Sequence, residues 1–446
     1  MKKKQRHSSA TNNHISTIDD AVDDAPLAVT PISIGTSGRV WAKIGLLSFG
    51  GPAAQIALMH REIVAQRGWL TEQQFANALS FCMFLPGPEA MQLATYSGWR
   101  LHGVRGGLLT GSLFILPGAL VMLALAIGYV YFGTVGWVES LFNGLKAGIS
   151  VIVLQALVKL AKLGLTHLMD WLIAIASFVA IFFADVPFPL IIASAAIYGF
   201  YSSHSSNGHG SFIPLPNMRT TCMGLMQWMA LWWVPIFVID LVFDNDQLAA
   251  IGYFFSQLAV VTFGGAYAGL AYIAQDVVGH LGWLQPSIIM DGLSLAESTP
   301  GPLILVTEFV GFVTAFHTGG LTYGITGALV AMWATFIPCF LWIFVGAPYL
   351  EWLTNQPRLR GALSAIMAAV VGVIANLFIW FALNILFSEI ATKQYGPVSI
   401  FIPNFTTVNL TIIAIAAICG VLAFWRHAGL LAILGTSGAI GLIFGG

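Results

Sequence analysis

The chain has 446 residues, of which 57% are hydrophobic and only 8% are charged. A soluble globular domain carries about 25% charged residues, because its surface needs them. This composition excludes a soluble enzyme, a nucleic-acid-binding protein and a disordered chain. Long continuous apolar runs also exclude a membrane β-barrel, whose strands alternate in polarity. We therefore predict an all-α polytopic membrane protein embedded in the lipid bilayer.

Two polar segments frame the first part of the chain. Residues 1–36 are rich in Ser, Asn and Asp and begin with the basic cluster MKKKQR. A secretory signal would place an apolar core directly behind these charges, and none follows, so we interpret the segment as a disordered cytoplasmic tail. Residues 202–225 are rich in Ser, His and Gly and are predicted to form a polar linker.

An internal repeat organises the rest of the sequence. After a shift of 214 positions, residues 49–88 align with 263–302 without a gap, and 14 of the 40 pairs are identical. Phe-Gly-Gly, Gly-Trp-Leu and Pro-Gly-Pro fall in one register, which chance matching does not supply. We predict a first copy at 37–201 and a second at 226–446, in which an extra helix at 226–243 comes first.

Each copy has two segments interrupted by Gly and Pro, followed by four uninterrupted apolar runs. At about 1.5 Å per residue, runs of 17 to 29 residues can each cross a hydrocarbon core of ~30 Å. The predicted runs lie near 104–132, 137–163, 168–184 and 187–201 in the first copy, and near 320–347, 361–387, 406–424 and 428–444 in the second.

The placement of positive charge predicts that the two copies face opposite sides of the membrane. Four arginines flank the broken segments of the first copy: Arg61, Arg67, Arg100 and Arg105. None has a basic counterpart 214 positions later, whereas Arg358 and Arg360 occur only in the second copy. Cytoplasmic loops gather Lys and Arg, so this pattern indicates an inverted-topology repeat. Half-segments of about 12 residues are too short to cross, which favours re-entrant helices over full crossings.

The breaks themselves are candidate binding elements. Pro and Gly interrupt a helix, and a half-helix that starts behind them points unpaired N–H groups and partial positive charge at whatever lies in front. Four such starts follow Gly51, Gly87, Gly265 and Gly301, and we predict that they converge on a small anion. Ordinary kinks are the alternative, and two breaks repeated in register favour the substrate site.

Three acidic residues near the breaks are candidates for proton coupling. Glu89 directly follows Pro-Gly-Pro, where the helix dipole and burial act on its protonation in opposite directions. A capping carboxylate in the first turn is the equally weighted alternative. Glu297 and Glu308 bracket the second break and are the weaker candidates. Arg61 and Arg100 either draw an anion towards the site or simply anchor the cytoplasmic side.

At the breaks the sequence resembles the chromate ion transporter family. The matching motifs are FGGPAAQIALMHREIV with GWL at 49–70, LPGPEAMQLATYSG at 85–98, FGGAYAGLAYIAQDVV with GWL at 263–284, and STPGPLILVTEFVGF at 298–312. The resemblance implies a long-chain, two-domain anion antiporter of the plasma membrane that exports chromate at the expense of the proton gradient. The second copy lacks the Pro and Glu of the first, at Ala266 and Leu303, so a symmetric role for both copies is not expected.

The predicted substrate site combines these motifs with the neutral hydrogen-bonding residues beside them. Its members are Phe49, Gly50, Gly51, Pro52, Gln55, Arg61, Pro86, Gly87, Pro88, Gln92, Arg100, Gly264, Gly265, Tyr267, Pro300, Gly301 and Pro302. The expected partners are protons and chromate or sulfate, which are both tetrahedral dianions, with no cofactor and no metal. The sequence is compatible with a homodimer. An anion channel is the first alternative function. A membrane-embedded enzyme is the second, although no nucleophile–base constellation supports it.

Overall fold

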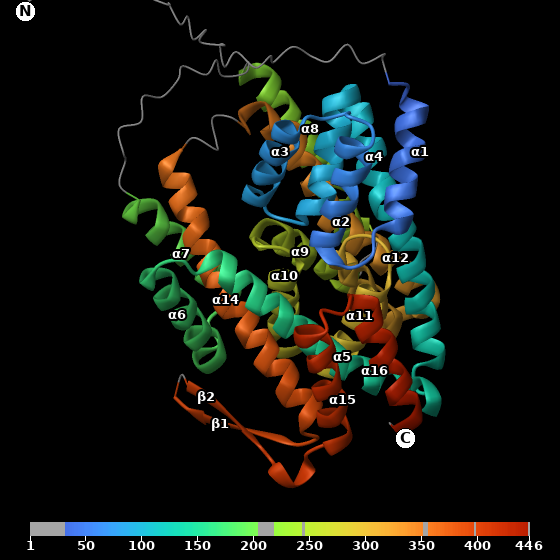
Figure 1. The fold of residues 1–446 in the computed structure, drawn as a ribbon, viewed down its shortest axis with the longest axis vertical. Helices are drawn as coiled ribbons and strands as arrows, with labels where there is room; N and C mark the ends of the chain where they lie inside the picture. Colours follow the sequence, from blue (N-terminus) through green and yellow to red (C-terminus); the bar gives the residue numbers. More distant parts are fainter. Residues whose placement is uncertain (1–31, 204–217, 243–245, 351–355, 397, 445–446) are drawn as a thin grey trace, which may run out of the picture.

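The computed structural model describes residues 32–203, 218–242, 246–350, 356–396 and 398–444. Nearly all of them are helical, and the helices run largely along the long axis of the molecule (Figure 1). The predicted all-α polytopic fold is therefore confirmed. The predicted disordered tail lies almost entirely outside the described residues, as does most of the predicted linker.

The segment predicted as the first copy contains seven α-helices and one π-helical turn: α1 (Ile34–Leu47), α2 (Gly51–Met59), η1 (His60–Ala65), α3 (Glu72–Phe84), α4 (Glu89–Phe132), α5 (Gly136–Gly164), α6 (Leu168–Ala184) and α7 (Phe188–Ser202). We keep the names first copy and second copy for the two predicted segments. Helix α8 (Met218–Val242) joins the copies. The second copy contains α9 (Asp246–Val261), α10 (Ala266–Ile273), η2 (Ala274–His280), α11 (Pro286–Ser298), η3 (Leu303–Leu305), α12 (Val306–Gly346), η4 (Ala347–Tyr349), α14 (Pro357–Leu386), η5 (Phe405–Thr407), α15 (Leu410–Gly420), η6 (Val421–Trp425) and α16 (Leu430–Phe444).

Local sequence signals place the ends of the early helices. The Ser33 hydroxyl accepts a hydrogen bond from the Thr36 N–H at 3.1 Å, so α1 begins inside the segment predicted as tail. Thr71 and Gln74 form a reciprocal capping box at the start of α3, which satisfies two N–H groups that the helix leaves free. Helix α8 likewise begins at Met218, within the predicted linker.

Both long helices α4 and α12 contain a sharp bend. In α4 the bend falls at His102 and Gly103, where Gly103 has φ of 62°. In α12 it falls at Gly319 and Gly320, where Gly320 has φ of 72°. The two bends are 217 residues apart rather than 214, because the three residues of η3 are added between the second break and α12.

Five described helical stretches are long and apolar enough to cross a membrane, fewer than the nine runs predicted. Four expected crossings are short: α6 has 17 residues, α7 and α16 have 15 each, and α15 continues through η6 to span Leu410–Trp425. A full crossing needs about 20 apolar residues. Long apolar helices thus lie at five of the nine predicted runs, and the other four runs form apolar helices of 10–17 residues.

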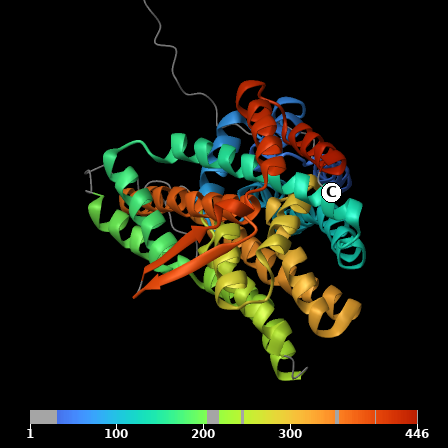
Figure 2. The same cartoon turned by 90° about the horizontal axis from the view of Figure 1, so that it is seen from below.

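Helices of the first copy pack against helices of the second copy. Helix α1 lies on α4 and α9 lies on α12, while α4 and α12 contact one another. Helix α5 of the first copy packs on α15 and α16 of the second, and α14 of the second packs on α6 and α7 of the first (Figure 2). Glycines permit close approaches between the two copies. A Cβ on Gly144 would overlap the Ser437 carbonyl oxygen, and one on Gly199 would overlap the Gly361 carbonyl oxygen.

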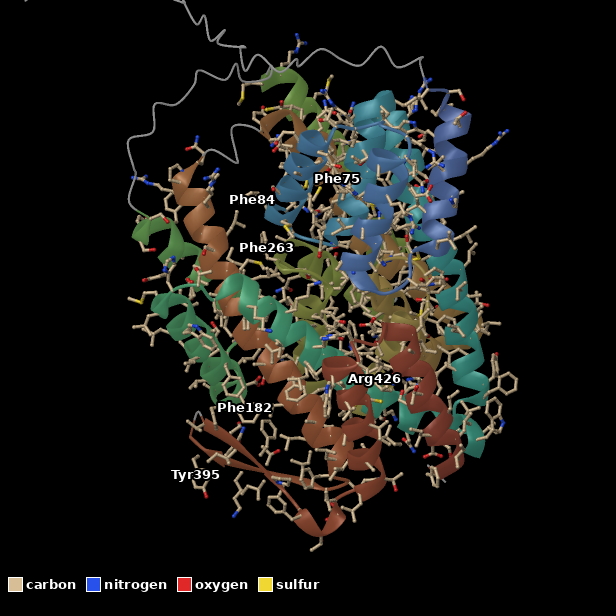
Figure 3. All side chains as sticks on the ribbon, in the orientation of Figure 1. Phe75, Phe84, Phe182, Phe263, Tyr395 and Arg426 are labelled. Carbon is tan, nitrogen blue, oxygen red and sulfur yellow. The ribbon has the colours of Figure 1, made fainter. Side chains whose placement is uncertain are left out.

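A β-hairpin that was not predicted follows α14. Strands β1 (Ile390–Tyr395) and β2 (Val398–Pro403) pair antiparallel, with Ile390 opposite Pro403 and Tyr395 opposite Val398. Tyr395 is exposed on this hairpin, at the end of the molecule far from Phe75 (Figure 3). Phe401 packs edge-on against Phe182 of α6 at 5.4 Å, which connects the hairpin to the first copy.

Candidate functional site

The four breaks are joined in two crossed pairs. The Gly87 N–H donates a hydrogen bond to the Thr262 carbonyl oxygen at 2.7 Å, and the Gly301 N–H donates one to the Ser48 carbonyl oxygen at 2.8 Å. Thr262 directly precedes Phe-Gly-Gly of the second copy, and Ser48 directly precedes Phe-Gly-Gly of the first. Each Pro-Gly-Pro break therefore lies against the Phe-Gly-Gly break of the other copy.

The first crossed pair requires glycine for both conformation and space. Gly87 has φ of 113° and Gly265 has φ of 92°, values that residues with a Cβ rarely adopt. A Cβ on Gly87 would lie 2.9 Å from Cys339 Sγ. A Cβ on Gly265 would lie 3.5 Å from Glu89 Oε1, which shows how closely the two breaks approach.

A cavity of about 300 Å³ lies at this first crossed pair, and we call it the Gly87 cavity. Four predicted site residues line it: Gly87, Glu89, Gly264 and Gly265. Its other walls come from the end of α3 (Cys82, Met83, Phe84 and Leu85), from α5 (Leu160) and from α14 (Arg360, Leu363, Ser364 and Met367). Phe84 and Phe263 lie at similar heights along the long axis of the molecule (Figure 3). Largely apolar walls with a few polar groups are typical of ligand sites.

The positive groups around the Gly87 cavity suit an anion, and one carboxylate beside them can gain or lose a proton. Helix α4 begins at Glu89 and α10 begins at Ala266, so two half-helices start beside the cavity. The N-terminus of a helix carries partial positive charge and free N–H groups. Arg360, in the first turn of α14, is exposed and adds a full positive charge at the rim. Glu89 supplies the one carboxylate of the lining.

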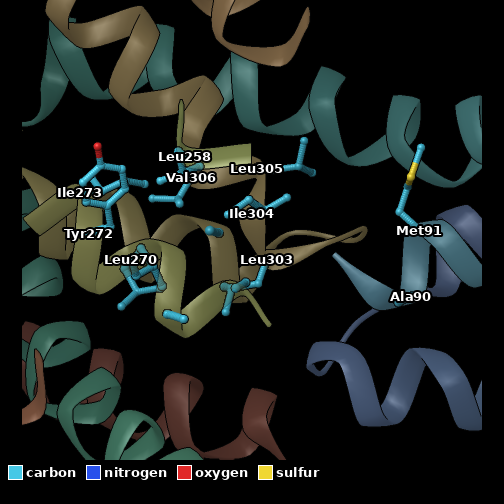
Figure 4. Close-up of a cluster of buried hydrophobic side chains, with 14 of the residues drawn as sticks. Ala90, Met91, Leu258, Leu270, Tyr272, Ile273, Leu303, Ile304, Leu305 and Val306 are labelled. Carbon is cyan, nitrogen blue, oxygen red and sulfur yellow. The ribbon is translucent and has the colours of Figure 1, made fainter. Parts of the chain in front are cut away.

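The second crossed pair is filled by protein side chains. Gln55 Nε2 donates hydrogen bonds to the Gly301 carbonyl oxygen at 2.6 Å and to the Ser48 carbonyl oxygen at 3.3 Å. The η3 residues Leu303, Ile304 and Leu305 pack among buried side chains of α9 and α10, which include Leu258, Leu270 and Ile273 (Figure 4). The two pairs therefore share a backbone arrangement and differ in what occupies the space beside it.

The three predicted proton-coupling residues lie in different surroundings. Glu89 lines the Gly87 cavity. Glu297, near the end of α11, is 3% exposed and accepts a hydrogen bond from the Tyr267 hydroxyl. Glu308, in the first turn of α12, is 2% exposed, and its Oε2 has no hydrogen-bond partner among the described residues. Only Glu89 combines a carboxylate with space for a ligand.

The remaining predicted site residues divide between the two pairs and the surface. Gln92 supports the first pair, because its Nε2 donates a 2.7 Å hydrogen bond to the Pro86 carbonyl oxygen. Residues of the second pair are Phe49, Gly50, Gly51, Pro52, Gln55, Pro300, Gly301 and Pro302. Arg61 and Arg100 are exposed and do not line the Gly87 cavity. Within the described residues, no group of three or more His, Cys, Asp and Glu could hold a metal ion.

Comparison with known proteins decides the family. The sequence profile described as Chromate transporter matches residues 36–200 and 249–442. The chain belongs to the chromate transporter family. A probable chromate transport protein of Synechococcus elongatus is 30% identical over 413 residues, which are 90% of this chain and 98% of that protein. The chromate transport protein of Cupriavidus metallidurans is 29% identical over 76% of this chain and 80% of its own length.

A third relative gives the same family. The chromate transport protein of Pseudomonas aeruginosa is 31% identical over 335 residues, which are 74% of this chain and 77% of that protein. No solved structure matches the chain. This chromate transporter family member is therefore a polytopic helical membrane protein, as its composition predicted. The motifs at its breaks predicted the family.

Two features of this chromate transporter family member were missed from the sequence. From the sequence, Arg360 indicates only the orientation of the second copy, whereas in the structure it lines the Gly87 cavity. Lys146 on α5 and Asp291 on α11 are not among the predicted site residues, and they form a buried ion pair with an Nζ to Oδ1 distance of 3.2 Å. Single charges within apolar segments were the available signal, because intramembrane charges are costly and usually functional.

Proposed function

We propose that this protein transports chromate across the plasma membrane and binds it in the Gly87 cavity. The observation that carries the proposal is the meeting of two half-helix starts, the Arg360 guanidinium and one carboxylate at a single cavity. The names of the relatives from three bacteria support chromate as the substrate. Sulfate, a dianion of the same tetrahedral shape, is the competing substrate.

An inverted repeat is the second part of the proposal. Its support is the pair of crossed hydrogen bonds, the matching bends in α4 and α12, and the two separate matches to one family profile. Under the positive-inside rule, the ends that carry Arg61 and Arg360 face the cytoplasm. The N-terminal tail then lies inside, and the rim of the Gly87 cavity opens to the cytoplasm.

Efflux follows from this orientation. A cavity open to the cytoplasm loads substrate from that side. An inside-negative membrane potential is worth about 2.3 kcal/mol per charge per 100 mV, and it drives an anion outwards. We therefore propose export rather than uptake.

Proton coupling is assigned to Glu89. A dianion in the cavity meets an ionised Glu89 as a like charge at close range, and protonation of the carboxyl removes that repulsion. Electrostatics therefore favours binding of the anion and a proton together. This sign differs from the simple exchange of anion for proton that the family resemblance implies. It leaves the membrane potential as the force that drives efflux.

The experiment is transport of labelled chromate and sulfate by the purified protein in proteoliposomes, with the potential and the pH gradient set separately. We expect saturable chromate flux in the wild type. Arg360→Gln should raise the half-saturating chromate concentration about tenfold, which corresponds to a loss of roughly 1.4 kcal/mol of binding free energy. Arg358→Gln is the matched control, because the Arg358 guanidinium stacks on the Phe200 ring at 5.6 Å. Absence of chromate flux would refute the proposal, and non-saturable flux that follows voltage alone would indicate a channel.

A further inference from the structure

A buried charged cluster joins three helices away from the Gly87 cavity. Asp291 on α11 is 5% exposed and accepts a hydrogen bond from the Tyr129 hydroxyl of α4 at 2.9 Å. Lys146 Nζ of α5 lies 3.2 Å from Asp291 Oδ1, and the Lys146 side chain is 14% exposed. Burying two charges costs several kcal/mol per ion, and their attraction often does no more than offset that cost. A cluster at membrane depth therefore calls for a role beyond stability.

The repeat relates this cluster to the wall of the Gly87 cavity. Helices α5 and α14 correspond at a shift of 217 residues, the same shift that relates the bends of α4 and α12. Gly144 and Gly361 correspond in this register, and both are glycines at close helix contacts, with α16 and with α7. In the same register Lys146 corresponds to Leu363, which lines the cavity. Lys146 therefore occupies the cavity-wall position of the other copy.

The two copies differ in how closely these walls approach. At the Gly87 cavity, the end of α3 from the first copy and the first turns of α14 from the second both border the open space. The corresponding helices α11 and α5 pack directly against each other. The Lys146–Asp291 ion pair bridges this contact, with Tyr129 completing the set of partners of Asp291. One half-site is thus open, and its counterpart is closed on an ion pair.

We propose that Lys146 is the anion-binding cation of this second half-site, and that Asp291 holds it as counter-ion while the half-site is closed. When α11 and α5 separate, a tetrahedral oxyanion dianion takes the place of the Asp291 carboxylate on the Lys146 ammonium. Arg360 then serves the anion at one membrane face, and Lys146 serves it at the other. The proposal rests on the proposed transport function and on the inverted repeat.

The test measures half-saturating chromate concentrations separately from the two membrane faces, in right-side-out and inside-out vesicles. Lys146→Gln should raise the value at least about tenfold at the face opposite the Gly87 cavity. The value at the cavity face should change by less than about twofold. Lys146→Arg keeps the charge and should restore the first value. Lys159→Gln is the matched control, because Lys159 is an exposed lysine of the same helix.

A second variant guards against misfolding, since Lys146→Gln alone leaves Asp291 without its cation. The double variant Lys146→Gln with Asp291→Asn is neutral and keeps both side-chain volumes, and it should show the same one-sided loss. Equal effects at both faces, or no effect in the double variant, would overturn the proposal while wild-type transport stands. A wild type that transports no chromate from either face would instead refute the proposed function.

Discussion

The amide of Gly87 donates a 2.7 Å hydrogen bond to the carbonyl oxygen of Thr262, across the boundary between the two copies. Backbone groups that a break frees at membrane depth must find partners in protein or water. Here the partner is the last residue before the break of the other copy, and Gly301 and Ser48 repeat the arrangement. Neither copy alone can therefore complete the site.

Replacement of Gly87 by alanine tests the first crossed pair. A Cβ at this position would lie 2.9 Å from Cys339 Sγ and 3.1 Å from Gln92 Nε2, on a backbone with φ of 113°. We expect loss of chromate transport, with destabilisation of about 1–3 kcal/mol. Gly68→Ala is the control, because Gly68 also has a positive φ of 59° but has open space around it. Normal transport by Gly87→Ala would show that the break is only a kink.

The inverted topology can be tested with one pair of cysteines. Ala65 and Gly279 correspond at the shift of 214 and are both exposed. In a Cys222→Ser background, which removes the exposed native thiol, Ala65→Cys should react with an impermeant thiol reagent only from the cytoplasmic face. Gly279→Cys should react only from the outer face. Labelling of both from one face would contradict the inverted repeat.

The parts of the fold that depend on local sequence were predictable. Breaks at Gly87 and Gly301 follow from Pro and Gly, and the long runs of α4, α5, α12 and α14 follow from apolar length. The hairpin after α14 was not predicted. In the structure Gly396 lies between its two short strands with φ of 63°.

The parts that depend on packing between the copies were not predictable from one sequence. Nothing local indicates that the Gly87 N–H pairs with Thr262, or that Arg360 reaches the same cavity as Glu89. The ungapped alignment ended at residue 302, so it concealed the three added residues of η3. That addition fills the second pair with Leu303 and Leu305 and makes the copies unequal.

The stabilisation that His280 gives at the exposed end of η2 should depend measurably on pH. Hydrogen bonding to Asp276, with Nδ1 to Oδ1 at 2.8 Å, raises the pKa of His280, and Asp185 at 3.2 Å from Nε2 adds to this. A raised pKa means that the stabilisation is complete below the ordinary value of about 6.5 and is lost as pH rises through the folded-state value. The contribution is under about 1 kcal/mol, because the site is exposed.

Thermal unfolding in detergent at a series of pH values measures this effect. His280→Gln should flatten the decline in unfolding temperature above pH of about 6.5. The exposed His317→Gln variant should keep the wild-type profile. An unchanged profile in His280→Gln would mean that the contacts with Asp276 and Asp185 do not stabilise the folded state.

Replacement of Glu89 by glutamine tests proton coupling directly. Glutamine keeps nearly the same shape and hydrogen-bonding capacity but cannot titrate, so the fold should survive. We expect chromate flux that no longer responds to the pH gradient, while chromate–chromate exchange continues and no longer needs a proton. If Glu89 is only a first-turn capping carboxylate, the variant should lose roughly 0.3–1 kcal/mol of stability and keep its coupling. Flux and exchange measured side by side in proteoliposomes separate these outcomes.

Glu297→Gln is the matched control, because Glu297 is buried against Tyr267 and does not line the cavity. Wild-type pH dependence in Glu89→Gln, with coupling lost in Glu297→Gln, would move the proton site to the second break.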